Sequence, residues 1–138
     1  MFELRMTYPA TKQLVERYTC GDCYILAPEL SKLTGWKVAI LHNSKNSYLK
    51  NPNAWYSCHV FCISPCGQWA LDINGLTPLK EMKSEWIDKC GAKTLYVCED
   101  LDDYQGVLDV WPKASSYDKR LARQTARRIC DKILHPKE

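Results

Sequence analysis

The sequence contains no long apolar run, no repeated segment and little net charge. No stretch approaches the length of a transmembrane helix, which argues against a membrane-spanning protein. The first ten residues have neither a basic start nor an apolar segment, so we expect no signal peptide and a cytoplasmic protein. A net charge of +3 is too small to indicate a nucleic-acid or membrane partner by itself. The 138 residues contain no evident linker and predict one domain, 1–138, with a single core.

Histidine is scarce in this chain and cysteine is abundant. Of the three histidines, His42 ends a predicted strand beside a polar loop, and His135 is expected to be exposed near the C-terminus. Eight cysteines can indicate disulfides, but without an export signal we predict a reducing compartment. Three of the eight lie among apolar neighbours and are expected to be small buried hydrophobic residues, namely Cys90, Cys98 and Cys130.

The hydrophobic pattern predicts a mixed α+β domain with a central antiparallel sheet and helices before and after it. The predicted strands are Phe2 to Met6, Lys37 to His42, Cys58 to Ser64, Trp69 to Ile73 and Lys93 to Cys98. The predicted helices are Thr11 to Tyr18, Cys23 to about Gly35, Thr77 to Lys89, and Ser115 or Ser116 to about Leu134. Two loops are predicted, the long polar segment Asn43 to Ala54 and the acidic segment Glu99 to Asp103.

Cys23 is predicted to stand at the start of a helix. Pro28 cannot donate its amide, so either the first turn is distorted or the regular helix begins later than Cys23. Asp22 is the predicted N-cap, accepting the amide of Tyr24 or Ile25. In this setting the backbone amide of Cys23 is the natural donor to an oxyanion.

His59 and Asp72 lie on consecutive predicted strands joined by a short turn. Directly paired residues of neighbouring strands share a face. When the loop between the strands has an even number of residues, the two residue numbers of each pair add up to an odd number. The odd-numbered His59 is then paired with an even-numbered residue. His59 then lies opposite Asp72 if Pro65 and Cys66 form the loop. If Pro65 to Gln68 form it, His59 lies opposite Asn74 with Asp72 on the diagonal. Either register puts the imidazole and the carboxylate within hydrogen-bonding reach.

A thiol at a helix start, an imidazole and a carboxylate are the parts of a cysteine-nucleophile enzyme. Asp72 (or Asn74) accepts a proton from one ring nitrogen of His59, and the other nitrogen faces the Cys23 sulfur. A histidine partner and a helix N-terminus both favour the thiolate, whereas the Asp22 carboxylate opposes it. We therefore predict Cys23, His59 and Asp72 as catalytic residues, with Asn74 and Asp22 in support and no cofactor needed.

The segments Gly21-Asp22-Cys23, Cys58-His59-Val60 and Leu71 to Gly75, in this order, resemble the papain-like and transglutaminase-like superfamily of thiol enzymes. The resemblance covers about Thr19 to Gly75 and implies a small papain-like fold. It implies Cys23 as nucleophile, His59 as base and then acid, and Asp72 as the orienting group. The implied activity is hydrolysis or acyl transfer at an amide of a protein or peptide substrate, as in a peptidase, deamidase or isopeptidase. Two features depart from the family: Pro28 in the nucleophile helix, and no glutamine shortly before Cys23.

Two non-enzymatic interpretations, a structural zinc site and a binding module, compete with the thiol enzyme. Cys20 and Cys23 form a C-x-x-C pair, and with Cys62 and Cys66 they have the composition of a structural zinc site. The same C-x-x-C pair also fits a redox motif, although the strand expected before it is missing.

A basic cluster on the C-terminal helix can instead contact phosphates or an acidic protein surface. Its members are Lys119, Arg120, Arg123 and Arg127. A solvated helix face is the simpler interpretation, because the chain as a whole is near neutral.

Overall fold

The computed structural model describes residues 7–20, 22–42, 57–92, 94–108 and 114–134. Its helices are α1 (Lys12–Cys20), α2 (Cys23–Thr34), α3 (Leu79–Cys90), α4 (Leu101–Leu108) and α5 (Ser116–Ile129), which continues as a π-helical turn over Cys130–Leu134. Its strands are β1 (Lys37–His42), β2 (Ser57–Ile63), β3 (Trp69–Asp72), β4 (Gly75–Pro78) and β5 (Thr94–Val97). The protein is therefore of the mixed helix-and-sheet class that the hydrophobic pattern predicts.

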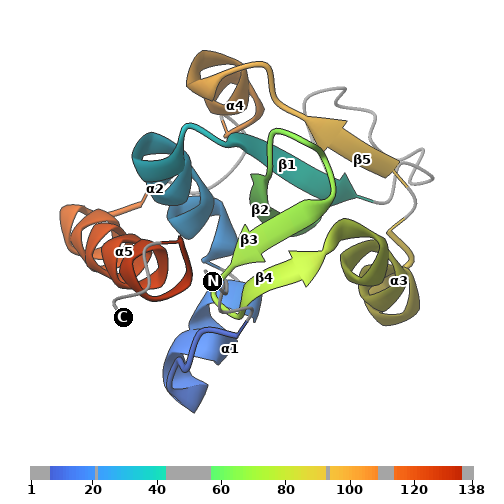
Figure 1. Cartoon of the computed structure of the whole chain (residues 1–138). Helices are drawn as coiled ribbons and strands as arrows, with labels where there is room; N and C mark the ends of the chain where they lie inside the picture. The colour runs from blue at the N-terminus through green and yellow to red at the C-terminus, as the bar shows by residue number, and fades with distance from the viewer. Residues whose placement is uncertain (1–6, 21, 43–56, 93, 109–113, 135–138) are drawn as a thin grey trace.

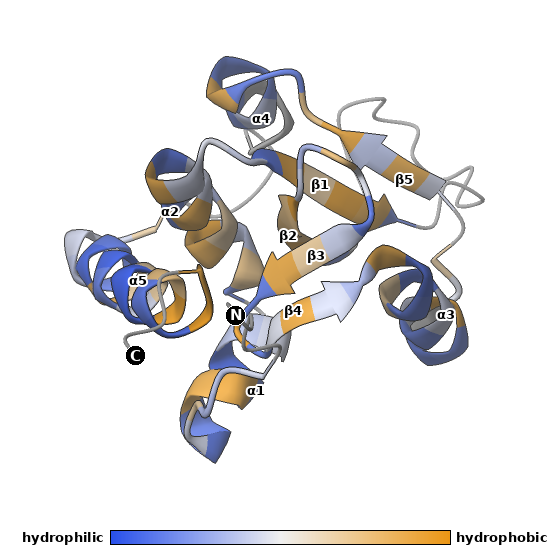
Figure 2. Ribbon diagram, in the orientation of Figure 1, coloured by the Kyte–Doolittle hydropathy of each residue, from blue (hydrophilic) through white to orange (hydrophobic). Residues whose placement is uncertain are grey.

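The five strands form one antiparallel sheet in the order β4-β3-β2-β1-β5. The helices α1, α2 and α5 lie on one side of this sheet and α3 on the other (Figure 1). The ribbon coloured by hydropathy shows α3 and α5 with apolar residues toward the sheet and polar residues on the outside (Figure 2). Within the described residues, no helix is long and apolar enough to cross a membrane.

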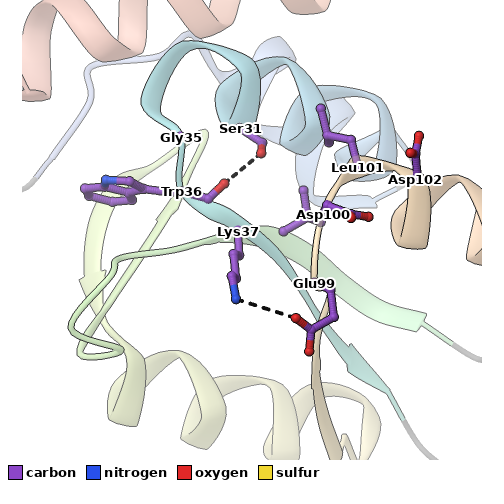
Figure 3. A pocket seen from close by; sticks show the side chains of 9 residues that line it. Ser31, Gly35, Trp36, Lys37, Glu99, Asp100, Leu101 and Asp102 are labelled. Carbon is purple, nitrogen blue, oxygen red and sulfur yellow. Dashed lines mark hydrogen bonds and ion pairs between the residues drawn. The ribbon is translucent and has the colours of Figure 1, made fainter.

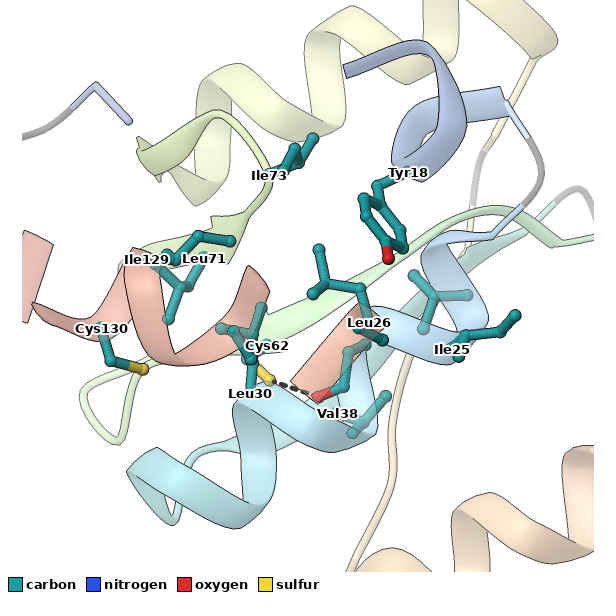
Figure 4. Close-up of a cluster of buried hydrophobic side chains, with 14 of the residues drawn as sticks. Tyr18, Ile25, Leu26, Leu30, Val38, Cys62, Leu71, Ile73, Ile129 and Cys130 are labelled. Atoms are coloured by element: carbon teal, nitrogen blue, oxygen red, sulfur yellow. Dashed lines mark hydrogen bonds between the residues drawn. The ribbon is translucent and has the colours of Figure 1, made fainter. Parts of the chain in front are cut away.

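Successive residues of the central strands point to opposite faces of the sheet, and each face has its own hydrophobic cluster, as expected for a sheet that is covered on both sides. Val60 and Cys62 of β2 point toward α2 and α5, whereas Phe61 and Ile63 point toward α3. The larger cluster includes the side chains labelled in Figure 4, namely Tyr18, Ile25, Leu26, Leu30, Val38, Cys62, Leu71, Ile73, Ile129 and Cys130. Cys98 and Cys130 are buried hydrophobic residues, as predicted.

The structure corrects the sequence prediction at two elements. Residues Gly75–Pro78 form the edge strand β4 rather than the start of a helix, so α3 begins at Leu79 and not at Thr77. The acidic segment predicted as a loop enters helix α4, because the Asp100 carboxylate accepts the Asp103 amide at 2.8 Å and caps the helix start. The predicted strand over residues 2–6, the polar loop over 43–54 and His135 lie outside the described residues.

Candidate active site

The β2–β3 hairpin brings His59 and Asp72 together. The strand pairs are Cys62↔Leu71 and Ile63↔Ala70. In the turn, the Ser64 carbonyl accepts the Gly67 amide, and the Ser64 amide donates to the Trp69 carbonyl. The loop is therefore the four-residue one, Pro65 to Gln68, and the continued register puts Asp72 on the diagonal from His59. The two side chains meet through a hydrogen bond of 2.8 Å from His59 Nε2 to Asp72 Oδ2. This hydrogen bond is the one that the hairpin geometry predicts.

The strands part just where this pair lies. The β2–β3 ladder ends before His59, and the β1–β2 register shifts between the pairs Leu41↔His59 and His42↔Ser57. Such a bulge re-aims neighbouring side chains and often occurs beside an active site. The other oxygen of the carboxylate, Asp72 Oδ1, accepts the backbone amide of Asn74 at 2.9 Å. Asn74 thus supports Asp72 through its main chain, which corrects the expectation that its side chain holds the ring.

His59 has no exposed surface, and its two ring nitrogens differ. Nε2 binds Asp72, whereas Nδ1 is buried without a hydrogen-bond partner in the described part of the chain. Burial lowers the pKa of His59, but the hydrogen bond to Asp72 and the nearby Cys23 thiol outweigh it and raise the pKa to about 9. Because Nε2 is occupied by Asp72, Nδ1 is the nitrogen left for the thiol. A buried polar atom without a partner calls for an explanation, and a functional role is one of them.

Trp86 of α3 covers the imidazole. The two rings stack with centroids 4.7 Å apart and planes inclined by 13°, and Phe61 lies on the same ring at 5.8 Å. The Lys89 ammonium lies 5.1 Å from the centroid of Trp86. Sequence periodicity puts Trp86 on the inward face of its helix but cannot tell which strand residue it meets. The contact with His59 is therefore a part of the site that only the fold reveals.

Cys23 is the first residue of α2, so its half-buried thiol stands at a helix N-terminus, as predicted. The amides of a first helical turn have no acceptor within the helix and face any group held there. Asp22 occupies the N-cap position, but its side chain makes no capping hydrogen bond. Its carboxylate instead accepts a bond of 2.9 Å from Arg17 Nε, while its backbone carbonyl accepts the Ile25 amide. The predicted capping role of the Asp22 side chain is therefore wrong.

Pro28 lies inside α2 without delaying the start of the helix. A proline at this position leaves the carbonyl four residues earlier, that of Tyr24, without its helical donor. The Tyr104 hydroxyl supplies the missing donor at 2.6 Å. Tyr104 is fully buried and comes from α4. The proline thus creates the acceptor through which α4 holds the turn that carries Cys23.

Replacing Tyr104 with phenylalanine should destabilise the protein by about 1–2 kcal/mol, because the Tyr24 carbonyl loses its donor while the ring still fills its site. Urea unfolding measures the change. Tyr117→Phe is the matched control, since that tyrosine is 64% exposed. Equal, near-zero changes in the two variants would contradict the anchoring role.

The cysteines that the sequence suggests as zinc ligands lie in different environments in the structure. Cys62 is fully buried and its thiol donates to the Ala27 carbonyl at 3.2 Å. Cys66 lies exposed in the β2–β3 turn, 3.3 Å from the Ser64 hydroxyl, whose hydrogen bond lowers the pKa of the Cys66 thiol. The Cys20 side chain lies outside the described residues. Among the side chains that are described, no three ligating groups gather around one point.

The basic residues of α5 are all exposed. Arg123 donates to Glu29 of α2 at 3.3 Å, and Glu29, which is buried, also accepts from Lys32 at 2.9 Å. One member of the basic cluster, Arg123, therefore forms an ion pair that joins α5 to α2.

A surface hollow of about 450 Å³ lies between the end of α2 and the start of α4 (Figure 3). It is lined by Ser31, Gly35, Trp36, Lys37, Val38, Glu99, Asp100, Leu101 and Asp102. Lys37 and Glu99 form an ion pair of 4.0 Å beside it. Cys23, His59 and Asp72 do not line this hollow, so it is separate from the candidate active site.

Comparison of the chain with protein-family models, with curated proteins and with solved structures finds no match in any of the three. The assignment of the site therefore depends on its own geometry and chemistry.

Proposed function

We propose that the protein is a cysteine-nucleophile hydrolase or acyl transferase of papain-like type, acting on an amide of a protein or peptide. The observation that carries the proposal is the buried His59, with Asp72 on one ring nitrogen at 2.8 Å and the Cys23 thiol near enough to raise the pKa of the ring. This arrangement is the nucleophile, base and orienting group of a thiol enzyme.

The proposed reaction begins from a protonated His59. With its pKa at about 9 the ring is an imidazolium at neutral pH, and a positive charge beside the sulfur favours the thiolate of Cys23. The thiolate attacks the substrate carbonyl carbon, and the negative charge moves to the oxygen, near the first-turn amides of α2. The imidazolium then protonates the leaving nitrogen as the carbon–nitrogen bond breaks, which leaves a thioester on Cys23.

The second half of the reaction restores the enzyme. Neutral His59 takes a proton from water, the hydroxide attacks the thioester carbonyl, and the acid product leaves as the Cys23 sulfur is released. An amine in place of water gives acyl transfer by the same steps. Throughout, Asp72 holds the ring and stabilises its positive form, and Trp86 and Phe61 exclude water from its faces.

A neutral alkylating reagent tests the nucleophile. Iodoacetamide at pH 7, followed by peptide mass spectrometry, should label Cys23 faster than Cys98 or Cys130, whose pKa values burial raises to about 12 and about 11. The exposed Cys66 is a competing thiol, so the measurement belongs in a Cys66→Ser background. Labelling of Cys23 no faster than of the buried thiols would remove the main support for an enzyme.

A further inference from the structure

One guanidinium joins the starts of two helices beside the candidate nucleophile. Arg17, in the last turn of α1, donates from Nε to Asp22 Oδ2 at 2.9 Å and from Nη2 to Asp118 Oδ1 at 2.8 Å. Asp22 precedes Cys23 at the start of α2, and Asp118 belongs to the capping box of α5. The three side chains are about one-third exposed, at 33%, 31% and 30%. This bridge is a geometric feature that the proposed reaction does not use.

The position of Asp22 conflicts with a thiolate at Cys23. A carboxylate next to a sulfur disfavours the negative form of that sulfur. The phenol of Tyr24 senses the same surroundings: burial raises its pKa, and the charges of Asp22, Asp118 and Cys23 raise it further. Among the described residues, the ionisable groups around the start of α2 include Arg17 and Tyr18 of α1, Asp22, Cys23 and Tyr24 of α2, His59 of β2, Tyr104 of α4 and Asp118 of α5.

We propose that Arg17 is a positioning residue of the active site, which neutralises Asp22 and holds its carboxylate out of the capping position at the start of α2. The inference rests on the proposed function, because it concerns the reactivity of the same thiol. The absent side-chain cap is its structural sign: an N-cap aspartate ordinarily binds the amides of its own helix, and here it binds the guanidinium instead. The pair with Arg17 thereby offsets the negative charge that stands next to the Cys23 thiol.

The test measures the rate of Cys23 alkylation by iodoacetamide against pH, in the Cys66→Ser background. Arg17→Gln should slow alkylation at pH 7 by about threefold to tenfold and move the profile toward higher pH, because Asp22 is then uncompensated. Asp22→Asn combined with Arg17→Gln should return the rate to within about twofold of the parent, since both charges are gone. Rescue by a second substitution distinguishes an electrostatic role from a structural one.

Two control variants complete the experiment. Asp118→Asn weakens the other arm of the bridge while keeping the pair of Arg17 with Asp22, and it should not slow alkylation. Arg128→Gln removes a positive charge from the exposed face of α5 and should leave the pH profile unchanged. A double variant as slow as Arg17→Gln, or an unshifted profile in Arg17→Gln, would overturn the role of Arg17. Failure of the proposed function has a different signature, in which His59→Ala also leaves the rate of Cys23 unchanged.

Discussion

Replacing His59 with alanine is expected to slow the alkylation of Cys23 at pH 7 by about tenfold to a hundredfold, the largest effect on reactivity among single changes that keep the thiol. The imidazolium that favours the thiolate is lost, and with it the proton donor of the proposed reaction. The difference in alkylation rate between the parent and the His59 variant should become smaller toward high pH. The reason is that His59 loses its proton near its pKa of about 9, so the parent protein loses the positive charge as well.

His42→Ala is the matched control for this change. His42 ends β1, and burial lowers its pKa, so it is not the positively charged partner that a thiolate needs. Its replacement should leave the rate of Cys23 alkylation unchanged within about twofold. If the His42 variant slowed the thiol as much as the His59 variant, the effect would belong to a disturbed sheet and not to a catalytic pair.

Replacing Asp72 with alanine is expected to give the largest loss of stability, about 3–5 kcal/mol, because it removes one member of a buried ion pair and leaves His59 without its partner. The Asn74 amide also loses its acceptor. Chemical denaturation at pH 7 measures the loss. Asp102→Ala, on the exposed face of α4, is the control and should change stability by less than about 0.5 kcal/mol.

The loss caused by Asp72→Ala should depend on pH in a definite direction. The pKa of His59 rises from 6.5 to about 9 in the folded protein, so the folded chain binds the proton more tightly than the unfolded chain. The stabilisation is therefore complete below about pH 6.5 and disappears as the pH rises through about 9. The stability difference between parent and variant should be larger at pH 6 than at pH 9.5. If that difference in stability increased toward high pH, the raised pKa of His59 would be contradicted.

The hairpin shows how far local rules reach. The parity of a short turn was enough to predict that His59 and Asp72 share a face, because side chains alternate strictly along a strand. It left two registers open, since two-residue and four-residue loops both satisfy the parity. The structure selects the longer loop, in which Gly67 adopts a positive φ of 77° and the Ser64 amide bonds to Trp69.

The errors in the sequence prediction also have local causes. The strand β4 was missed because its only large apolar residue, Leu76, is flanked by glycine and threonine, which is a weak strand signal. Thr77 belongs to this strand, which ends at Pro78. The carboxylates of α4 are typical of a loop until one of them is recognised as a helix cap. Asp22 is a strong N-cap by residue type, but an arginine from the preceding helix competes for the same oxygen. Only in this last case did a neighbouring element outweigh a local preference.

The sequence by itself determined the mixed fold, a helix beginning near Cys23 and the shared face of His59 and Asp72. These depend on hydrophobic periodicity, on the Gly35 helix stop and on turn length, and all of them act between residues close in the chain. Only the tertiary structure decided that α2 approaches β2 with its N-terminus near His59, that Trp86 covers the imidazole and that Arg17 takes the Asp22 carboxylate. These contacts join separate elements, and they form because burying the two faces of one sheet brings distant segments into a single arrangement.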